Sequence, residues 1–171
     1  MIKGEKIYLR AILKSDITYL NEWKNDVKTF QYLGGGFIPT SIDQQEKWID
    51  SLIDTSGNDK RFIISGNDGS PLGMVGLYGI NWRDRTCEIG IYIGNHSAKG
   101  KGVGKEACEL MEYFAKEHLN LRKIKLNVVT ENTKALQMWS SLGYIKAGEY
   151  KAERYIKGEY KDLSLMEKMI N

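Results

Sequence analysis

Apolar and polar residues alternate at the start of the chain and then recur at helical spacing. Residues 5–13, EKIYLRAIL, place an apolar residue at every second position, which predicts a half-buried strand. Ser15 stands where it would cap a helix whose apolar residues extend to Trp23. The three glycines and the proline of residues 32–40 predict a loop. Ser41 has a glutamine three residues later and a helical apolar face beyond it, so a second helix is expected there.

The period changes from that of helices to that of strands at Arg61. Three runs, RFIIS, PLGMVGLYGI and TCEIGIYIG, are separated by the short turns GNDG and WRDR. Strands joined by turns this short pair with their sequence neighbours. This part of the chain therefore predicts an antiparallel meander of three strands.

Strand and helix alternate in the second half of the chain. Apolar residues recur at helical spacing from Val103 to Phe114, and KIKLNVV then alternates like a strand, which implies a parallel crossover. A short helix is expected from Asn132 until Gly143 ends it, and two strands complete the chain. The expected fold is an α/β (α+β) domain spanning residues 1–171, in which about four helices flank a mixed, mostly antiparallel sheet of about seven strands.

The composition narrows the class of protein. With 42% hydrophobic and 27% charged residues the chain is typical of a globular domain. It shows no signal peptide and no apolar run long enough for a membrane span, so we expect a cytoplasmic protein without membrane attachment. A net charge of +3 on scattered lysines does not favour nucleic acid. Cys87 and Cys108 have neither CxxC spacing nor a histidine cluster nearby, so no metal is expected.

The segment AKGKGVGKEA, residues 98–107, carries the clearest chemical signal. A glycine-rich turn that enters a helix gathers backbone N–H groups at the positive end of the helix dipole, which favours phosphate. It is not a P-loop, because Lys99 replaces the first glycine and Glu106 replaces the magnesium-binding hydroxyl. It is not a dinucleotide fingerprint either, because its glycines alternate and the turn follows a meander.

The same segment resembles the pyrophosphate loop of the GNAT superfamily of acyl-CoA-dependent N-acetyltransferases. The family signature [QR]-x-x-G-x-[GA] is matched by residues 99–104 at every position but the first, where lysine stands. NTKALQMWSSLGY is similar to the later family segment N-x-x-A-x-x-x-Y-x-x-x-G-[FY]. Both ends of the chain resemble the branch typified by ribosomal-protein N-terminal and spermidine acetyltransferases. The resemblance covers essentially the whole chain.

This resemblance implies a fold, a cofactor and a set of binding residues. Acetyl-CoA would be the acyl donor, with its pantetheine arm in a gap between the strand around residue 91 and the strand near residues 127–129. The lysines of the loop could equally be a solvated basic edge, and Asn132 could simply cap a helix. The residues expected to contact the cofactor are Ile91, Tyr92, Ile93, Lys99, Gly100, Lys101, Gly102, Val103, Gly104, Lys105, Asn132, Ala135 and Trp139.

Two residues bear on catalysis. Glu88 is the candidate base, since strand alternation places it opposite the apolar Cys87 and Ile89; an ordinary surface glutamate is the alternative. Many relatives carry tyrosine at position 139 as the general acid, and this chain has Trp139, whose indole supplies no proton at neutral pH. A cofactor-binding module without catalysis is therefore a rival interpretation.

The acceptor is expected to be a primary amine, of a small molecule such as a polyamine, an amino sugar or an aminoglycoside, or of a protein N-terminus. By resemblance, the acceptor cleft lies between the first pair of helices and the C-terminal hairpin. A homodimer is possible, and no nucleic-acid partner is expected. The residues expected to contact the acceptor are Trp23, Tyr32, Phe37 and Tyr155.

Overall fold

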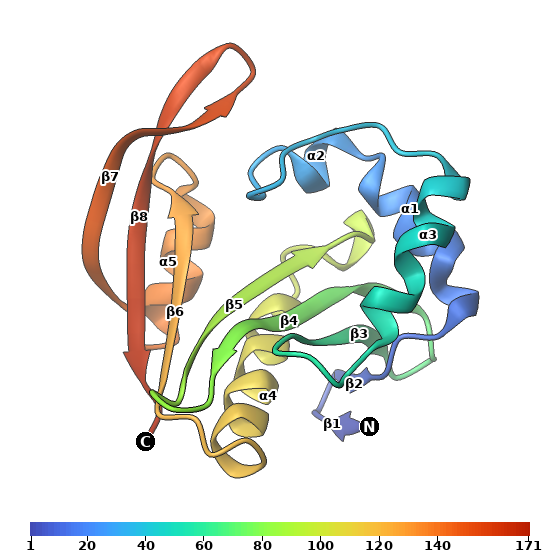
Figure 1. The fold of residues 1–171 in the computed structure, drawn as a ribbon, viewed down its shortest axis with the longest axis horizontal. Helices are drawn as coiled ribbons and strands as arrows, with labels where there is room; N and C mark the ends of the chain where they lie inside the picture. Colours follow the sequence, from blue (N-terminus) through green and yellow to red (C-terminus); the bar gives the residue numbers. More distant parts are fainter.

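A mixed sheet of eight strands forms the centre of the fold, and the computed structural model describes all residues 1–171 (Figure 1). The strands lie in the order β1-β2-β3-β4-β5-β6-β8-β7, and only β5 and β6 run parallel. The expected meander and parallel crossover are thereby confirmed. The strands are β1 (Ile2–Lys3), β2 (Ile7–Arg10), β3 (Lys60–Gly66), β4 (Pro71–Asn81), β5 (Thr86–Ile93), β6 (Lys123–Val129), β7 (Ile145–Ile156) and β8 (Glu159–Met169).

Five α-helices flank this sheet (Figure 1). The first three pack on one face, the fourth packs on the other face, and the fifth lies beside β6. None of them combines the length and the apolar character needed to cross a bilayer. The helices are α1 (Ile17–Lys24), α2 (Val27–Phe30), α3 (Ile42–Ile53), α4 (Val103–Glu117) and α5 (Thr133–Ser141).

The mixed α/β class is as expected, with one strand and one helix more. The additional elements, β1 with two residues and α2 with four, are too short to show a hydrophobic period. Ser41 caps α3 as expected, because its Oγ accepts from the Gln44 N–H at 3.1 Å.

The start of α1 differs from the expectation. Asp16, not Ser15, is the N-cap residue of this helix. Its carboxylate binds the Arg10 guanidinium at 2.7 Å and the Leu13 N–H at 2.8 Å, which draws residues 14–16 into a 3-10 turn before the helix. The strand expected over residues 5–13 is accordingly shorter, and β2 ends at Arg10.

Two apolar cores hold the helices on the sheet. The larger one joins β4, β5 and β6 to α4, with Leu77, Ile124 and Met111 fully buried. The smaller one joins α1 and α3 to the other face and contains Trp23. Both cysteines lie in the larger core, and burial raises the pKa of Cys87 to about 12, which leaves that thiol protonated at neutral pH.

The sheet opens between its two parallel strands. Residues Thr86–Glu88 of β5 pair with Lys123–Lys125 of β6, and no pairing continues beyond them. Both strands nevertheless run on, to Ile93 and Val129, each paired on its outer edge with the next strand of the sheet. The two halves therefore diverge in a V, which Figure 1 shows as the separation of β5 from β6.

Candidate active site

The V leaves two strand edges without a partner. Along an extended strand, every second residue directs its N–H and C=O to the same edge. Beyond Glu88 the inner edge of β5 faces the inner edge of β6, and neither edge takes part in the sheet. An extended ligand between them can pair with backbone on either side, as a strand does at an exposed edge.

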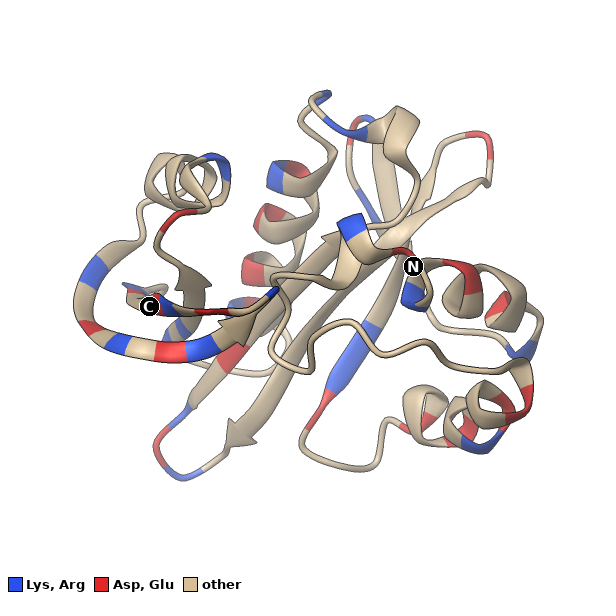
Figure 2. Cartoon of the chain, turned by 90° about the horizontal axis from the view of Figure 1, so that it is seen from above, with Lys and Arg blue, Asp and Glu red and all other residues tan.

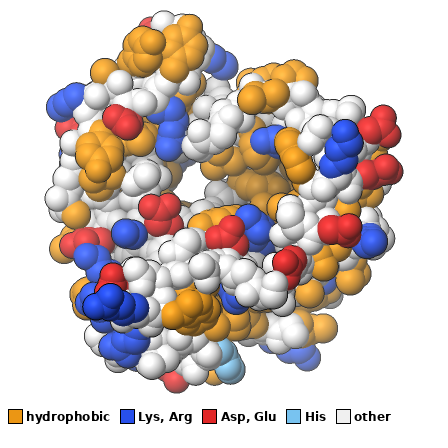
Figure 3. Space-filling view, in the orientation of Figure 1, with side chains coloured by type: hydrophobic (Ala, Val, Ile, Leu, Met, Phe, Trp, Pro, Cys, Tyr) orange, Lys and Arg blue, Asp and Glu red, His pale blue; other side chains and the backbone are white.

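A cavity of about 530 Å³ fills this opening, within the range of small-molecule sites. The space-filling view shows the molecule hollowed at this point, between the half that carries β7 and β8 and the half that carries α1–α3 (Figure 3). The cavity extends from the residues between β5 and α4, through the gap, to α2 and α5. No acidic residue lines it.

The glycine-rich segment forms one end of the cavity. Gly100 and Gly102 have φ values of +74° and +77°, in the left-handed region that glycine tolerates best. Gly102 is the N-cap residue of α4 and offers no side chain to the first turn, so backbone N–H groups at this helix start stay available to a ligand. The geometry fits an anion at the positive end of a 15-residue helix.

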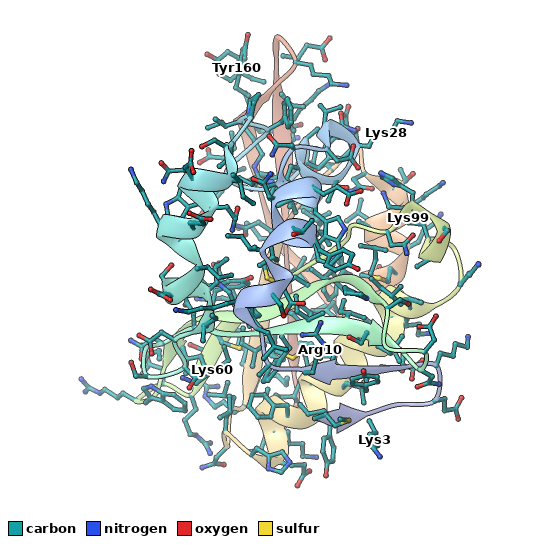
Figure 4. The ribbon with its side chains drawn as sticks, turned by 90° about the vertical axis from the view of Figure 1, so that its right-hand side faces the viewer. Lys3, Arg10, Lys28, Lys60, Lys99 and Tyr160 are labelled. Carbon is teal, nitrogen blue, oxygen red and sulfur yellow. The ribbon has the colours of Figure 1, made fainter.

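Lysines line the cavity from several elements. Lys99 and Lys105 line it from the loop and α4, and Lys28 and Lys134 line it from α2 and α5. Figure 4 shows Lys28 and Lys99 on the same side of the molecule, although they come from different halves of the chain. Four cations without a carboxylate among the lining residues favour a ligand with several negative charges.

The structure brings together all but one of the residues expected to contact the cofactor. Lys101 does not line the cavity; its side chain is exposed and its carbonyl oxygen accepts from Lys6 Nζ at 3.2 Å. Asn132 both lines the cavity and caps α5, since its Oδ1 accepts from the Ala135 N–H at 3.4 Å. The expected residues that line it are Ile91, Tyr92, Ile93, Lys99, Gly100, Gly102, Val103, Gly104, Lys105, Asn132, Ala135 and Trp139.

Glu88 stands at the apex of the V. It is the last residue of β5 to pair with β6, opposite Lys125, and its other neighbour across the sheet is Tyr78 of β4. Its side chain is exposed, whereas Cys87 and Ile89 are buried against the α4 side, so Glu88 belongs to the face that carries α1–α3. Glu88 is not among the residues that line the cavity, and its role as base stays a prediction.

Trp139 is both a cavity residue and a core residue. It lines the gap from α5, is 5% exposed, and meets the Tyr144 ring edge to face at 5.1 Å. The Tyr144 hydroxyl is buried without a hydrogen-bond partner, and burial raises its pKa. Tyr144 does not line the cavity, so it does not replace the missing hydroxyl at position 139.

The residues expected to contact the acceptor divide into two groups. Tyr32 lines the cavity, and Tyr155 lines a neighbouring one. Trp23 is 3% exposed and packs against Tyr92 in the smaller core, where it supports the wall instead of forming it. Phe37 lines neither cavity.

Several lining residues carry no sequence signal of their own. Lys28 and Thr29 reach the cavity because Asp26 caps the short helix α2, accepting from the Lys28 N–H at 3.1 Å and the Thr29 hydroxyl at 2.8 Å. On α5, Met138 stands three residues after Ala135, a helical spacing that could have indicated it, whereas Lys134 is at helical spacing from neither Asn132 nor Ala135. The contact of Lys6 with the loop joins segments about a hundred residues apart, which no local pattern indicates.

The comparisons with known proteins agree with this geometry. The acetyltransferase (GNAT) domain family matches residues 6–145. Spermidine N(1)-acetyltransferase of Vibrio cholerae is 26% identical over 95% of this chain and 92% of its own length. The enzyme of that name from Escherichia coli is 28% identical, over 95% of this chain and 85% of its own length.

Solved structures show the same arrangement of the chain. The crystal structure of spermidine N-acetyltransferase from Vibrio cholerae in complex with CoA and spermine superposes with a TM-score of 0.89. The identity is 26%, and the match covers 97% of this chain and 96% of the other. With the family match over most of the sequence, the chain belongs to the GNAT family of acyl-CoA-dependent N-acetyltransferases.

Proposed function

We propose that this protein transfers the acetyl group of acetyl-CoA to a primary amine of a small molecule. The observation that carries the proposal is that one cavity contains both the basic, glycine-rich start of α4 and the unpaired edges of β5 and β6. Coenzyme A has the matching parts, a phosphate-rich nucleotide end and a long neutral arm with amide groups. Spermidine, the substrate named for both relatives, is the reference acceptor.

The donor's position follows from this match. The pyrophosphate lies on the N–H groups at Gly102 and the first turn of α4, with Lys99 and Lys105 beside it. The pantetheine arm extends between β5 and β6 and pairs with their free edges. A backbone N–H of β5 then polarises the thioester carbonyl and stabilises the oxyanion as it forms.

The reaction needs little beyond this placement. The neutral amine attacks the thioester carbon, the nitrogen of the tetrahedral intermediate loses its extra proton to water, the carbon–sulfur bond breaks, and coenzyme A leaves as a thiolate. Glu88 takes the proton of the incoming ammonium through water. Trp139 supplies no proton to the thiolate. A thiol has an ordinary pKa of about 8.5, so its thiolate is a tolerable leaving group and water can protonate it.

The proposal is tested by amine-dependent release of coenzyme A. Acetyl-CoA and the purified protein are mixed with spermidine and with other amines, and the free thiol is followed with time. We expect release that depends on both the protein and the amine, together with an acetylated amine by mass spectrometry. Saturable binding of acetyl-CoA without release with any amine would contradict the proposal and leave an acyl-CoA-binding module.

A further inference from the structure

A second cavity, of about 450 Å³, adjoins the first. It lies between the glycine loop at residues 34–36 and the β7–β8 hairpin, and Leu33 and Asn127 line both cavities. Asn127 belongs to the part of β6 that diverges from β5. The second cavity therefore borders the one in which the acetyl group is proposed to lie.

Arg154 is the cation in this second cavity. It is half-buried on β7, and its Nη1 donates to the Tyr32 carbonyl oxygen at 2.7 Å. Its Nη2 would lie 3.7 Å from a Cβ built on Gly34, so the guanidinium lies against the glycine loop. Nε and Nη2 have no hydrogen-bond partner, and burial lowers the pKa of the group.

The other half-buried arginines of this chain either have a carboxylate partner or lie outside both cavities. Arg10 and Arg61 each bind an aspartate, at 2.7 and 3.0 Å. Arg85 and Arg122 donate to neutral oxygens but line neither cavity. Arg154 thus combines three properties, partial burial, the absence of a carboxylate and a place on a cavity wall. A desolvated guanidinium without an anion is costly, and a bound anion offsets the cost.

The surrounding charges do not suit a simple polycation. Glu153 is the one carboxylate that lines the second cavity, and none lines the first. Two nearby carboxylates already have partners, since Glu149 binds Lys151 at 2.6 Å and Glu131 binds Lys161 at 2.9 Å. Along β7 itself, basic and acidic residues alternate (Figure 2). A polyamine would meet an arginine and few free carboxylates.

We propose that Arg154 binds a negatively charged group of the acceptor, a carboxylate or a phosphate, so that the acceptor is an amine that also carries a negative charge. The inference rests on the proposed function and narrows its class of acceptor. Nε and Nη2, which have no partner in the protein, can donate two parallel hydrogen bonds to such a group. The amine of the same molecule then extends past Asn127 toward the gap.

Matched pairs of amines test this directly. Lysine and cadaverine differ by one carboxylate, and glucosamine 6-phosphate and glucosamine differ by one phosphate. For the wild-type protein we expect kcat/KM to be at least about ten-fold higher for the member of one pair that carries the anionic group, and the pair that responds distinguishes carboxylate from phosphate. Spermidine serves as the acceptor without a negative group.

Variants connect the preference to Arg154. In Arg154→Gln, kcat/KM for the preferred acceptor should fall about 10- to 100-fold, mainly through KM, while kcat/KM for the partner compound that lacks the anionic group changes less than about two-fold. Arg154→Lys should retain an intermediate preference, because it keeps the charge and loses the paired donors. Arg83→Gln, on an exposed turn outside both cavities, is the matched control and should change nothing.

Three results overturn the inference. One is a wild-type protein that acetylates cadaverine, glucosamine or spermidine as efficiently as the compounds that carry a carboxylate or a phosphate. Another is an Arg154→Gln variant that lowers both members of a pair equally, since that pattern means a structural role for the arginine. In both cases the proposed function survives. If acetyl-CoA binds and no amine of the set releases coenzyme A, the proposed function fails and this inference fails with it.

Discussion

In the proposed reaction, the identity of residue 139 bears on how the leaving thiolate gains its proton. Trp139 faces the cavity yet is almost fully buried, and it packs on Tyr144. Its indole N–H can donate a hydrogen bond to sulfur but cannot transfer a proton at neutral pH. At this position the side chain contributes core packing and supplies no acid.

Trp139→Tyr is therefore expected to keep the activity or to raise it, because it introduces a hydroxyl at the wall of the gap. The substitution removes aromatic volume, so the free energy of unfolding should fall by about 1–3 kcal/mol. Steady-state kcat with acetyl-CoA and the best amine is the measurement. Trp139→Phe is the control without a hydroxyl, and a large loss of kcat in both variants would show that the indole itself takes part.

Glu88→Gln tests the proposed base. We expect kcat to fall by about 100-fold while the Kd of acetyl-CoA hardly changes, because Glu88 stands at the apex of the V and does not line the cavity. Activity should recover in part as the pH rises and more amine is neutral. Glu117→Gln, exposed at the end of α4, is the control. Equal kcat in the wild type and Glu88→Gln would leave Glu88 as a surface residue.

At the scale of the element, the start of α4 is the part that we propose to bind phosphate. Its N-cap residue is a glycine in a left-handed conformation, and the preceding turn holds a second glycine of the same kind. A side chain at Gly102 would both strain the turn and stand close to the Lys6 amine, at 3.4 Å.

Gly102→Val should consequently abolish the binding of acetyl-CoA, with a rise in Kd of at least about 100-fold. Isothermal titration of the folded variant gives the value. Gly57→Val is the matched control, because Gly57 lies in a loop, has open space around it and does not have a positive φ. Unchanged affinity in Gly102→Val would remove the loop from the cofactor site.

Elements long enough to repeat their hydrophobic pattern could be predicted from the sequence, and the shortest elements could not. The meander from β3 to β5, the crossover through α4 and the terminal hairpin all repeat their pattern over at least seven residues. The prediction of Ser15 as the N-cap of α1 is wrong, because the contact of Asp16 with Arg10 overrides the local preference of Ser15. In the site, the loop and Asn132 could be predicted from their motifs, whereas Lys28 lies on a helix too short to show a hydrophobic period, and the contact of Lys6 with the loop joins distant segments.

At the scale of the whole molecule, the site depends on two halves of the sheet that share only a short parallel pairing. One half carries α1–α3, and the contact between Arg10 and Asp16 fixes where those helices leave the sheet. Asp16 is 3% exposed. Burial by itself raises the pKa of this carboxyl, but the hydrogen bonds from Arg10 and the Leu13 N–H outweigh it and hold the pKa below its usual range.

Asp16→Asn should therefore lower the free energy of unfolding at neutral pH by about 1–3 kcal/mol. Because the folded pKa is depressed, this stabilisation is fully present above the unfolded pKa, near 4, and is lost as the pH falls through the folded value. Urea unfolding of both proteins between pH 3 and 7 measures it. The difference between wild type and variant should shrink below about pH 4. A constant difference at all pH values would contradict the assignment.

The central claim is that the cavity between β5 and β6 holds acetyl-CoA. The most direct test is calorimetric titration of the purified wild-type protein with acetyl-CoA, with ATP as the control for phosphate binding in general. We predict saturable binding of one acetyl-CoA per chain and no comparable binding of ATP. No binding of acetyl-CoA, or equal binding of both, would contradict the claim that this opening is an acetyl-CoA site.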